Sequence, residues 1–254
     1  MDIRIYSPRE QGVGQFDEGK ITEQKPIGFP GEGSAVKRVG PLFYWAWAHA
    51  EQEGFIGSHP HQAFEIMTYV IQGSADHGDS LGTRQMVEAG GLQVIQAGSG
   101  VWHNERLIGP AFEGFQIWFE PYLNESIKMA PTYNQYPHEA FPQKYENGVT
   151  IKTIIGEGAP VHIVADARMW DIELEQGSRY THQVKGHHAL AVLATRGGGE
   201  VLQQSFAEKD FLVLVEETGN LSEVEFRTAS GDGALRLTVI EVPYDPGYPL
   251  YPKR

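Results

Sequence analysis

The chain has 254 residues, of which 41% are hydrophobic, carries a net charge of −13 and contains no cysteine. This apolar content is enough for a buried core, and the absence of cysteine excludes disulfides, zinc–thiolate sites, iron–sulfur clusters and cysteine nucleophiles. The negative charge repels phosphate backbones, which argues against direct binding to nucleic acid. The first residues, MDIRIYSPREQG, lack the apolar stretch of a signal peptide, and no window has the roughly 18 apolar residues of a membrane helix. We therefore expect a cytoplasmic protein without a membrane anchor.

Seven runs with the character of β-strands follow one another along the chain, each bounded by Gly, Asp, Asn or Pro. They are FEIMTYVI (64–71), LQVIQ (92–96), FEGFQIWF (112–119), RMWDIEL (168–174), LAVLA (190–194), FLVLV (211–215) and LRLTVIEV (235–242). Thirty glycines and 15 prolines provide the turns between such strands. Helical periodicity is scarce, so the pattern predicts an all-β fold of the sandwich or barrel type.

The β pattern lapses between residues 120 and 150, where prolines and tyrosines predict an extended, ordered connector with a domain boundary inside it. A faint internal repeat supports two domains: GSHPHQAFEIMTYVIQGSA (57–75) resembles THQVKGHHALAVLATRGGG (181–199), and GGLQVI (90–95) resembles KDFLVL (209–214). We predict two similar β-barrels in tandem, at residues 1–130 and 131–254. The second would end in an extended arm, VPYDPGYPLYPKR, whose proline density excludes regular helix and central strand.

Potential metal ligands recur at i, i+2 spacing in two places. His59 and His61 lie on either side of a proline, and His103 and Glu105 lie on either side of an asparagine. In a β-strand this spacing puts both members of a pair on one face. We expect Glu65 to follow on the same strand and face as the first pair. Imidazoles and a carboxylate that converge in one barrel suit a first-row divalent ion with positions left open for a ligand.

The second half of the chain serves as an internal comparison. In the repeat, Gln183 and Lys185 stand opposite the two histidines of the first pair, so we expect a metal in the first barrel alone. His182 lies off these positions and is not expected to bind metal. His77, within SADHGDS, is expected in a solvated turn after a strand.

The stretch GSHPHQAFEIMTYVIQG, followed by AGSGVWHNE, resembles the signature of the pirins, a branch of the cupin superfamily. The segment IWFEPYLNESIKMAPTYNQY (117–136) resembles the stretch that closes the pirin N-terminal barrel and leads to the second. The resemblance covers most of the chain and is strong from about residue 35 to 136. It implies a bicupin, with two antiparallel β-barrels face to face and metal only in the N-terminal one.

The resemblance also implies a ligand set. Pirins bind metal, usually iron, through the histidines of HPH and the histidine and glutamate of HxE, which here are His59, His61, His103 and Glu105. Cupins in general use the glutamate four residues after the second histidine, which here is Glu65. Both glutamates are present; we favour Glu105 as the ligand and place Glu65 behind an imidazole. Fe(II) is the expected ion, with Mn, Ni, Co, Cu and Zn as alternatives.

Three residues beside these ligands depart from the common pirin pattern. Gln62 and Ala63 stand where Arg and Gly are usual, and Asn104 stands where Ala is frequent. The ligands themselves are unaffected, but the departures leave the substrate preference open.

The resemblance implies two functions of different classes. The first is a quercetin 2,3-dioxygenase-like enzyme that opens a flavonol with dioxygen, with Glu105 as the catalytic base and Met67, Tyr69 and Val101 lining an apolar pocket for the flat substrate. The alternative is an iron-binding, redox-sensing regulator that binds protein partners without catalysis. Another reaction at the same metal, such as isomerisation, also fits the ligands, and the sequence alone does not choose between these functions.

Overall fold

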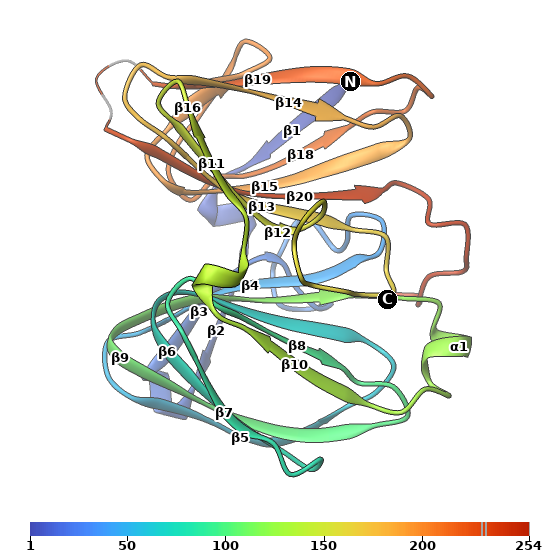
Figure 1. The fold of residues 1–254 in the computed structure, drawn as a ribbon. Helices are drawn as coiled ribbons and strands as arrows, with labels where there is room; N and C mark the ends of the chain where they lie inside the picture. Colours follow the sequence, from blue (N-terminus) through green and yellow to red (C-terminus); the bar gives the residue numbers. More distant parts are fainter. Residues whose placement is uncertain (230, 232, 254) are drawn as a thin grey trace. The chain divides into compact units, whose positions relative to one another are not determined.

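The protein is described by a computed structural model that covers residues 1–229, 231 and 233–253. These residues form 20 strands, three short 3-10 turns and one four-residue helix, α1 (Leu123–Ser126). Figure 1 shows that strands make up most of the chain. The prediction of an all-β fold is confirmed. Within the described residues, no helix has the length and apolar character needed to cross a membrane.

The chain forms two compact units. The first unit consists of Gln11–Ala140, Ile163–Ala165 and the C-terminal segment from Gly247 onward, and the second unit consists of Met1–Glu10, Phe141–His162 and Asp166–Pro246. The predicted domain ranges 1–130 and 131–254 stay a prediction, because compact units and domains of common ancestry need not have the same limits.

The first unit is built on a nine-stranded antiparallel sheet in the order β10-β8-β6-β9-β4-β3-β2, with β5 paired to β9 and β7 paired to β6. Its strands are β2 (Gly12–Phe16), β3 (Ile21–Ile27), β4 (Leu42–Ala50), β5 (Gly54–His61), β6 (Glu65–Asp79), β7 (Arg84–Glu88), β8 (Leu92–Gln96), β9 (Val101–Phe119) and β10 (Thr132–Tyr136). The long strands β6 and β9 run side by side (Figure 1). In their register Glu65 lies opposite Phe119 and Asp79 lies opposite His103. This pairing places β9, which carries His103 and Glu105, beside the largely buried strand β6.

The second unit has a seven-stranded sheet, β1-β18-β15-β20-β13-β12-β11, and a four-stranded sheet, β14-β19-β16-β17. The strands are β1 (Asp2–Tyr6), β11 (Gln143–Glu146), β12 (Val149–Ile155), β13 (Arg168–Leu174), β14 (Arg179–Val184), β15 (His188–Arg196), β16 (Gly199–Val201), β17 (Gln204–Phe206), β18 (Phe211–Val215), β19 (Ser222–Thr228) and β20 (Leu235–Pro243). Its core includes a cluster of buried aliphatic and aromatic side chains, among them Leu190, Val192, Leu212 and Leu237.

Each of the seven predicted runs overlaps a strand, and β8, β13 and β18 have the predicted limits. The runs within β6 and β9 were predicted too short: these strands have 15 and 19 residues. The segment predicted as a connector contains β10, which pairs with β8, and β11, which pairs with β12.

The expectation that both histidines of HPH share a strand with Glu65 was wrong. β5 ends at His61 and β6 begins at Glu65. Between them Ala63 adopts a left-handed conformation, with φ of 67°, which bends the chain and which glycine adopts at lower energy. The amide of Ala63 donates to the carbonyl of Gly98 at 2.8 Å. Glu65 therefore starts a new strand with its own direction.

Candidate metal centre

Three of the predicted ligands come together. β5 pairs antiparallel with β9, and His59 lies directly opposite His103 in this register. The rings of His59 and His61 are 4.8 Å apart, and that of His103 is 4.4 Å from His59 and 4.8 Å from His61. One ring nitrogen from each lies within 4.8 Å of the others. This is a spacing at which three imidazoles can bind one ion.

The nitrogen atoms of this cluster fit a metal ion. The Nδ1–H of His59 donates to the carbonyl oxygen of Gly57 at 2.8 Å, which leaves Nε2 with a free lone pair. Nε2 of His61 and both ring nitrogens of His103 are buried without a hydrogen-bond partner among the described residues. Burial, together with repulsion between the rings, lowers the pKa of His61 and of His103 to about 3. Neutral imidazoles with unused lone pairs are the form that binds a metal.

Glu105 is buried beside this cluster, with 1% of its surface exposed. Its carboxylate accepts hydrogen bonds from Oγ1 of Thr68 at 2.9 Å, Nε2 of Gln93 at 2.6 Å and Nε2 of Gln116 at 2.9 Å. These donors fix the orientation of the carboxylate and leave about one of its four lone-pair sites unused. Glu105 as the fourth ligand stays a prediction.

Glu65, the rival candidate, is equally buried but is held by other groups. Its carboxylate accepts hydrogen bonds from Nε2 of Gln96 at 2.7 Å and from the backbone amides of Val164 and Ala165 at 2.6 and 2.9 Å. Burial raises the pKa of Glu65, and the hydrogen bonds from Ala165, Gln96 and Val164 offset this only in part. The carboxylate thus fastens residues 163–165 to β6.

The prediction of a solvated turn at His77 was wrong. β6 continues through this residue to Asp79, and the pairing with β9 places His77 opposite Glu105. The side chain is 1% exposed, and its ring stacks on Tyr133 with centres 4.3 Å apart and planes at 20°. The ring also lies 5.5 Å from that of His103. One feature of the sequence could have indicated that His77 lies on a strand: His77 and Asp79 have the same i, i+2 spacing as the ligand pairs.

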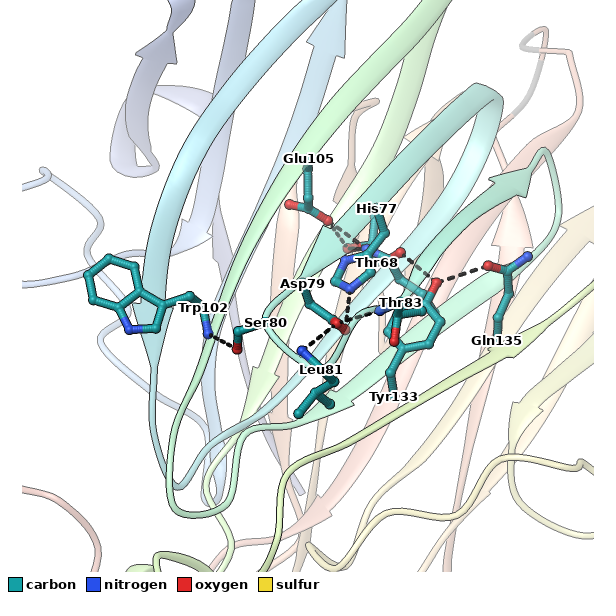
Figure 2. Close-up of polar contacts among 11 residues, drawn as sticks. Thr68, His77, Asp79, Ser80, Leu81, Thr83, Trp102, Glu105, Tyr133 and Gln135 are labelled. Atoms are coloured by element: carbon teal, nitrogen blue, oxygen red, sulfur yellow. Dashed lines mark hydrogen bonds and ion pairs between the residues drawn. The ribbon is translucent and has the colours of Figure 1, made fainter.

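Asp79 holds His77 and closes the turn between β6 and β7, as Figure 2 shows. Its Oδ2 accepts a hydrogen bond from Nε2 of His77 at 2.9 Å, and its Oδ1 accepts the amides of Leu81 and Thr83, both at 2.9 Å. Burial raises the pKa of Asp79, but the hydrogen bonds from His77, Thr83 and Leu81 outweigh this effect and the pKa is lowered. The carboxylate is therefore an acceptor for all three donors.

An aromatic pocket of about 620 Å³ lies in the same unit. It is lined by Phe29, Pro30, Phe43, Phe64, Trp118, Tyr251, Pro252 and Lys253. Trp118 connects it to the cluster: its ring meets that of His61 edge-on at 4.8 Å, and its Nε1 donates to Oε1 of Gln116 at 3.1 Å. By contrast Met67, Tyr69 and Val101, which were predicted to line a pocket, are at most 1% exposed and belong to the core.

The C-terminal arm forms one wall of this pocket. Arg38 and Glu120 form an ion pair at 3.0 Å, and the Glu120 carboxylate also accepts the amide of Tyr251. The Tyr248 hydroxyl donates to the carbonyl of Glu120 at 2.6 Å. Nζ of Lys253 lies 4.2 Å from the ring centre of Phe43 and donates to its carbonyl. The arm is therefore fastened by several partly buried polar contacts.

The histidines of the second unit do not form such a cluster. His182 is 3% exposed, but Nδ1 is 2.8 Å from the Tyr180 hydroxyl and Nε2 is 3.3 Å from Glu241. Both nitrogens are thus engaged. Throughout the part of the chain that the structure describes, His59, His61 and His103 are the one group of three or more potential ligands at metal-binding distance.

Comparison with known proteins identifies the family. Residues 44–119 match the family described as Pirin. The "Putative quercetin 2,3-dioxygenase" of Pseudomonas aeruginosa is 33% identical over 164 residues, which span 63% of this chain and 68% of that protein. The chain belongs to the pirin family. A second relative, Pirin-like protein 2 of Arabidopsis thaliana, is 32% identical over 153 residues, which are 58% of this chain but only 47% of the plant protein. The match therefore spans about half of that relative.

The pirin fold extends over almost the whole chain. The crystal structure of a bacterial pirin from Escherichia coli in complex with nickel(II) superposes with a TM-score of 0.77, covers 95% of this chain and 99% of that one, and is 20% identical. At this identity the likeness establishes the fold alone. The predicted class, antiparallel cupin barrels of the bicupin type, is confirmed.

Proposed function

We propose that this pirin is a metal-dependent dioxygenase that opens a flavonol such as quercetin with dioxygen. The observation that carries the proposal is the contact between His61 and Trp118, which joins three imidazoles with free nitrogens to an aromatic pocket. The names of two relatives support the same chemistry: the one from Escherichia coli is described as a quercetin 2,3-dioxygenase, and the one from Pseudomonas aeruginosa as a putative quercetin 2,3-dioxygenase. Fe(II) remains the first candidate ion, with Ni, Mn, Co, Cu and Zn as alternatives.

The pocket suits a flat aromatic molecule. Its volume of about 620 Å³ lies within the range of roughly 300–1,000 Å³ that is usual for small-molecule sites. Phe29, Phe43, Phe64 and Trp118 offer ring faces and edges for stacking. Lys253 at the wall donates hydrogen bonds to the carbonyls of Lys37 and Phe43, and burial lowers its pKa to about 7, so it is only partly charged at neutral pH.

The residues around the cluster divide the chemical work. A divalent ion held by His59, His61 and His103 would supply a Lewis-acidic, redox-capable centre with open positions for a substrate oxygen and for dioxygen. In this proposal Glu105 takes a proton from a substrate hydroxyl. Gln116 donates to Glu105 and accepts from Trp118, so it couples the orientation of the base to the pocket wall.

The test is to load the purified protein anaerobically with each of these ions and add quercetin and then oxygen. We expect loss of the flavonol absorbance with release of one carbon monoxide per quercetin consumed. Trp118→Leu should raise KM for quercetin with unchanged metal content, because it removes stacking surface but no ligand. If the protein binds each of the ions stoichiometrically and releases carbon monoxide with none of them, the proposal is refuted.

The regulatory alternative has one observation in its favour. Trp102, the neighbour of His103 on β9, is 54% exposed, and its amide is held by the Ser80 hydroxyl at 3.1 Å (Figure 2). A large exposed aromatic residue beside a ligand could contact a protein partner and respond to the charge of the ion. Binding of a partner that depends on the oxidation state of iron, and that Trp102→Ala abolishes, would support this function. Equal binding in both oxidation states would refute it.

A further inference from the structure

The environment of His103 has one unexplained feature. Both ring nitrogens are buried without a partner among the described residues. A metal ion can take only one of them, and the other nitrogen of a ligating imidazole then carries a proton and almost always donates it to an acceptor. A buried N–H without an acceptor is unfavourable. An acceptor for His103 should therefore lie nearby.

His77 offers that acceptor. Its Nε2 faces Oδ2 of Asp79 at 2.9 Å, and the carboxylate can only accept, so the proton of His77 lies on Nε2. In the neutral ring Nδ1 then carries a lone pair, and it too is buried without a partner among the described residues. A metal-bound His103 thus has an N–H that lacks an acceptor, and His77 has a nitrogen, Nδ1, that lacks a donor.

The separation of the two rings fits this pairing. A hydrogen bond of about 3 Å between two imidazole nitrogens places the ring centres about 5 Å apart. The ring centres of His77 and His103 are 5.5 Å apart, which is close to this separation.

The His77 ring is held in place from two sides. Tyr133 stacks on one face at 4.3 Å, and the Tyr133 hydroxyl lies 2.9 Å from Oε1 of Gln135 and 3.2 Å from Oε1 of Gln93 (Figure 2). Asp79 binds the ring edge through Nε2 of His77, and hydrogen bonds from the amides of Leu81 and Thr83 fix the Asp79 carboxylate. Because these contacts fix the ring, Nδ1 of His77 points in a defined direction.

We propose that His77, oriented by Asp79, is a positioning residue for the metal centre, and that its Nδ1 accepts the proton-bearing nitrogen of His103. The proposal rests on the proposed metal site and extends it by two residues that do not bind the ion. A carboxylate–imidazole pair behind a ligand fixes the tautomer and ring orientation and makes the ligand a stronger donor. The pair should therefore increase metal affinity and stabilise Fe(III) relative to Fe(II).

Asp79→Asn is the sharpest variant. The remaining carbonyl oxygen can keep the two turn amides, while the new NH₂ group faces Nε2 of His77 as a donor. The proton of His77 must then move to Nδ1, where it opposes the N–H of His103. His77→Phe keeps the stack on Tyr133 and removes the acceptor, and His77→Asn restores an oxygen near the position of Nδ1.

The measurements are the dissociation constant for Co²⁺, from competition with a chromophoric chelator, and the visible spectrum of the Co²⁺ protein. We expect Asp79→Asn and His77→Phe to bind Co²⁺ about 10–100-fold more weakly, with shifted visible bands, and His77→Asn to recover part of the loss. His182→Asn is the matched control, because His182 is also buried and paired with a carboxylate but lies in the second unit. Thermal melts of the apoproteins report any loss of folding.

The outcomes separate this proposal from the one on which it rests. Failure of the unmodified protein to bind Co²⁺ would overturn the metal centre and this role of His77 together. Normal binding and unchanged spectra in both Asp79→Asn and His77→Phe would overturn the role of His77 alone. An effect of equal size in His182→Asn would show general destabilisation and would also overturn it.

Discussion

Glu65 and Glu105 allow a matched experiment on the identity of the fourth ligand. Each is 1% exposed, and each carboxylate accepts three hydrogen bonds. Replacement of either by alanine leaves three donors without their acceptor. At about 1 kcal/mol for a donor that water can reach and up to about 3 kcal/mol for a buried one, the three donors together amount to a loss of roughly 3–9 kcal/mol of unfolding free energy in each variant. At the lower end this corresponds to a fall in Tm of roughly 10 °C.

The two variants should differ in metal binding. Glu65→Ala should retain the wild-type affinity for Ni²⁺, because the lost contacts are to Gln96 and to the amides of residues 164 and 165. Glu105→Ala should bind Ni²⁺ more weakly by tenfold or more. Thermal unfolding monitored by circular dichroism and calorimetric titration with Ni²⁺, both below the lower Tm, give the two quantities. Loss of Ni²⁺ binding in folded Glu65→Ala with normal binding in Glu105→Ala would refute the assignment.

Three further outcomes follow from the contacts of the first unit. His61→Ala and His103→Ala should each lose bound metal after dialysis, measured by elemental analysis, whereas His182→Ala should remain like wild type. Burial lowers the pKa of His61 and His103 to about 3 from the ordinary value of 6.5, so between these values the unfolded chain binds more protons than the folded one. The apoprotein should therefore have its full unfolding free energy above pH 6.5. Below this pH, each of the two histidines should lower the unfolding free energy by at most about 1.4 kcal/mol per pH unit. Urea unfolding at pH 7, 6 and 5 that shows no decline in unfolding free energy would contradict this. Glu120→Ala should free the arm that carries Tyr251, with cleavage beyond residue 246 in limited proteolysis and unchanged metal content; an arm as resistant as in wild type would show that other contacts hold it.

The strands and the three imidazoles could be predicted from the sequence for a simple reason. Alternation with period two and the i, i+2 spacing are local properties, and a strand converts them directly into a shared face. The limits of β8, β13 and β18 follow from turn residues that stand next to them in the chain. His59, His61 and His103 needed only the further assumption that their two strands are neighbours, which the register of β5 and β9 fulfils.

The errors arose where a contact distant in the sequence, or a single backbone angle, decided the structure. Ala63 breaks the expected strand because its φ is positive, a conformation that the residue type does not announce. His77 is next to charged residues and glycine, so its neighbours in sequence indicate a turn, yet pairing of β6 with β9 buries it against Tyr133. The pocket wall formed by Tyr251 and Lys253 could not be foreseen, because it depends on contacts with residues more than 200 positions away.

By itself, the amino-acid sequence determined the β-strands, the absence of thiol chemistry and the histidine pairs that can bind a metal, because each of these depends on residue type and short spacing. The tertiary structure decided which polar groups meet. It engaged Glu65 with the amides of residues 164 and 165, placed Glu105 among three side-chain donors and brought His77 beside His103. The physical reason is that a buried polar group must find a partner, and which partner it finds depends on strand register and on contacts between segments far apart in the chain.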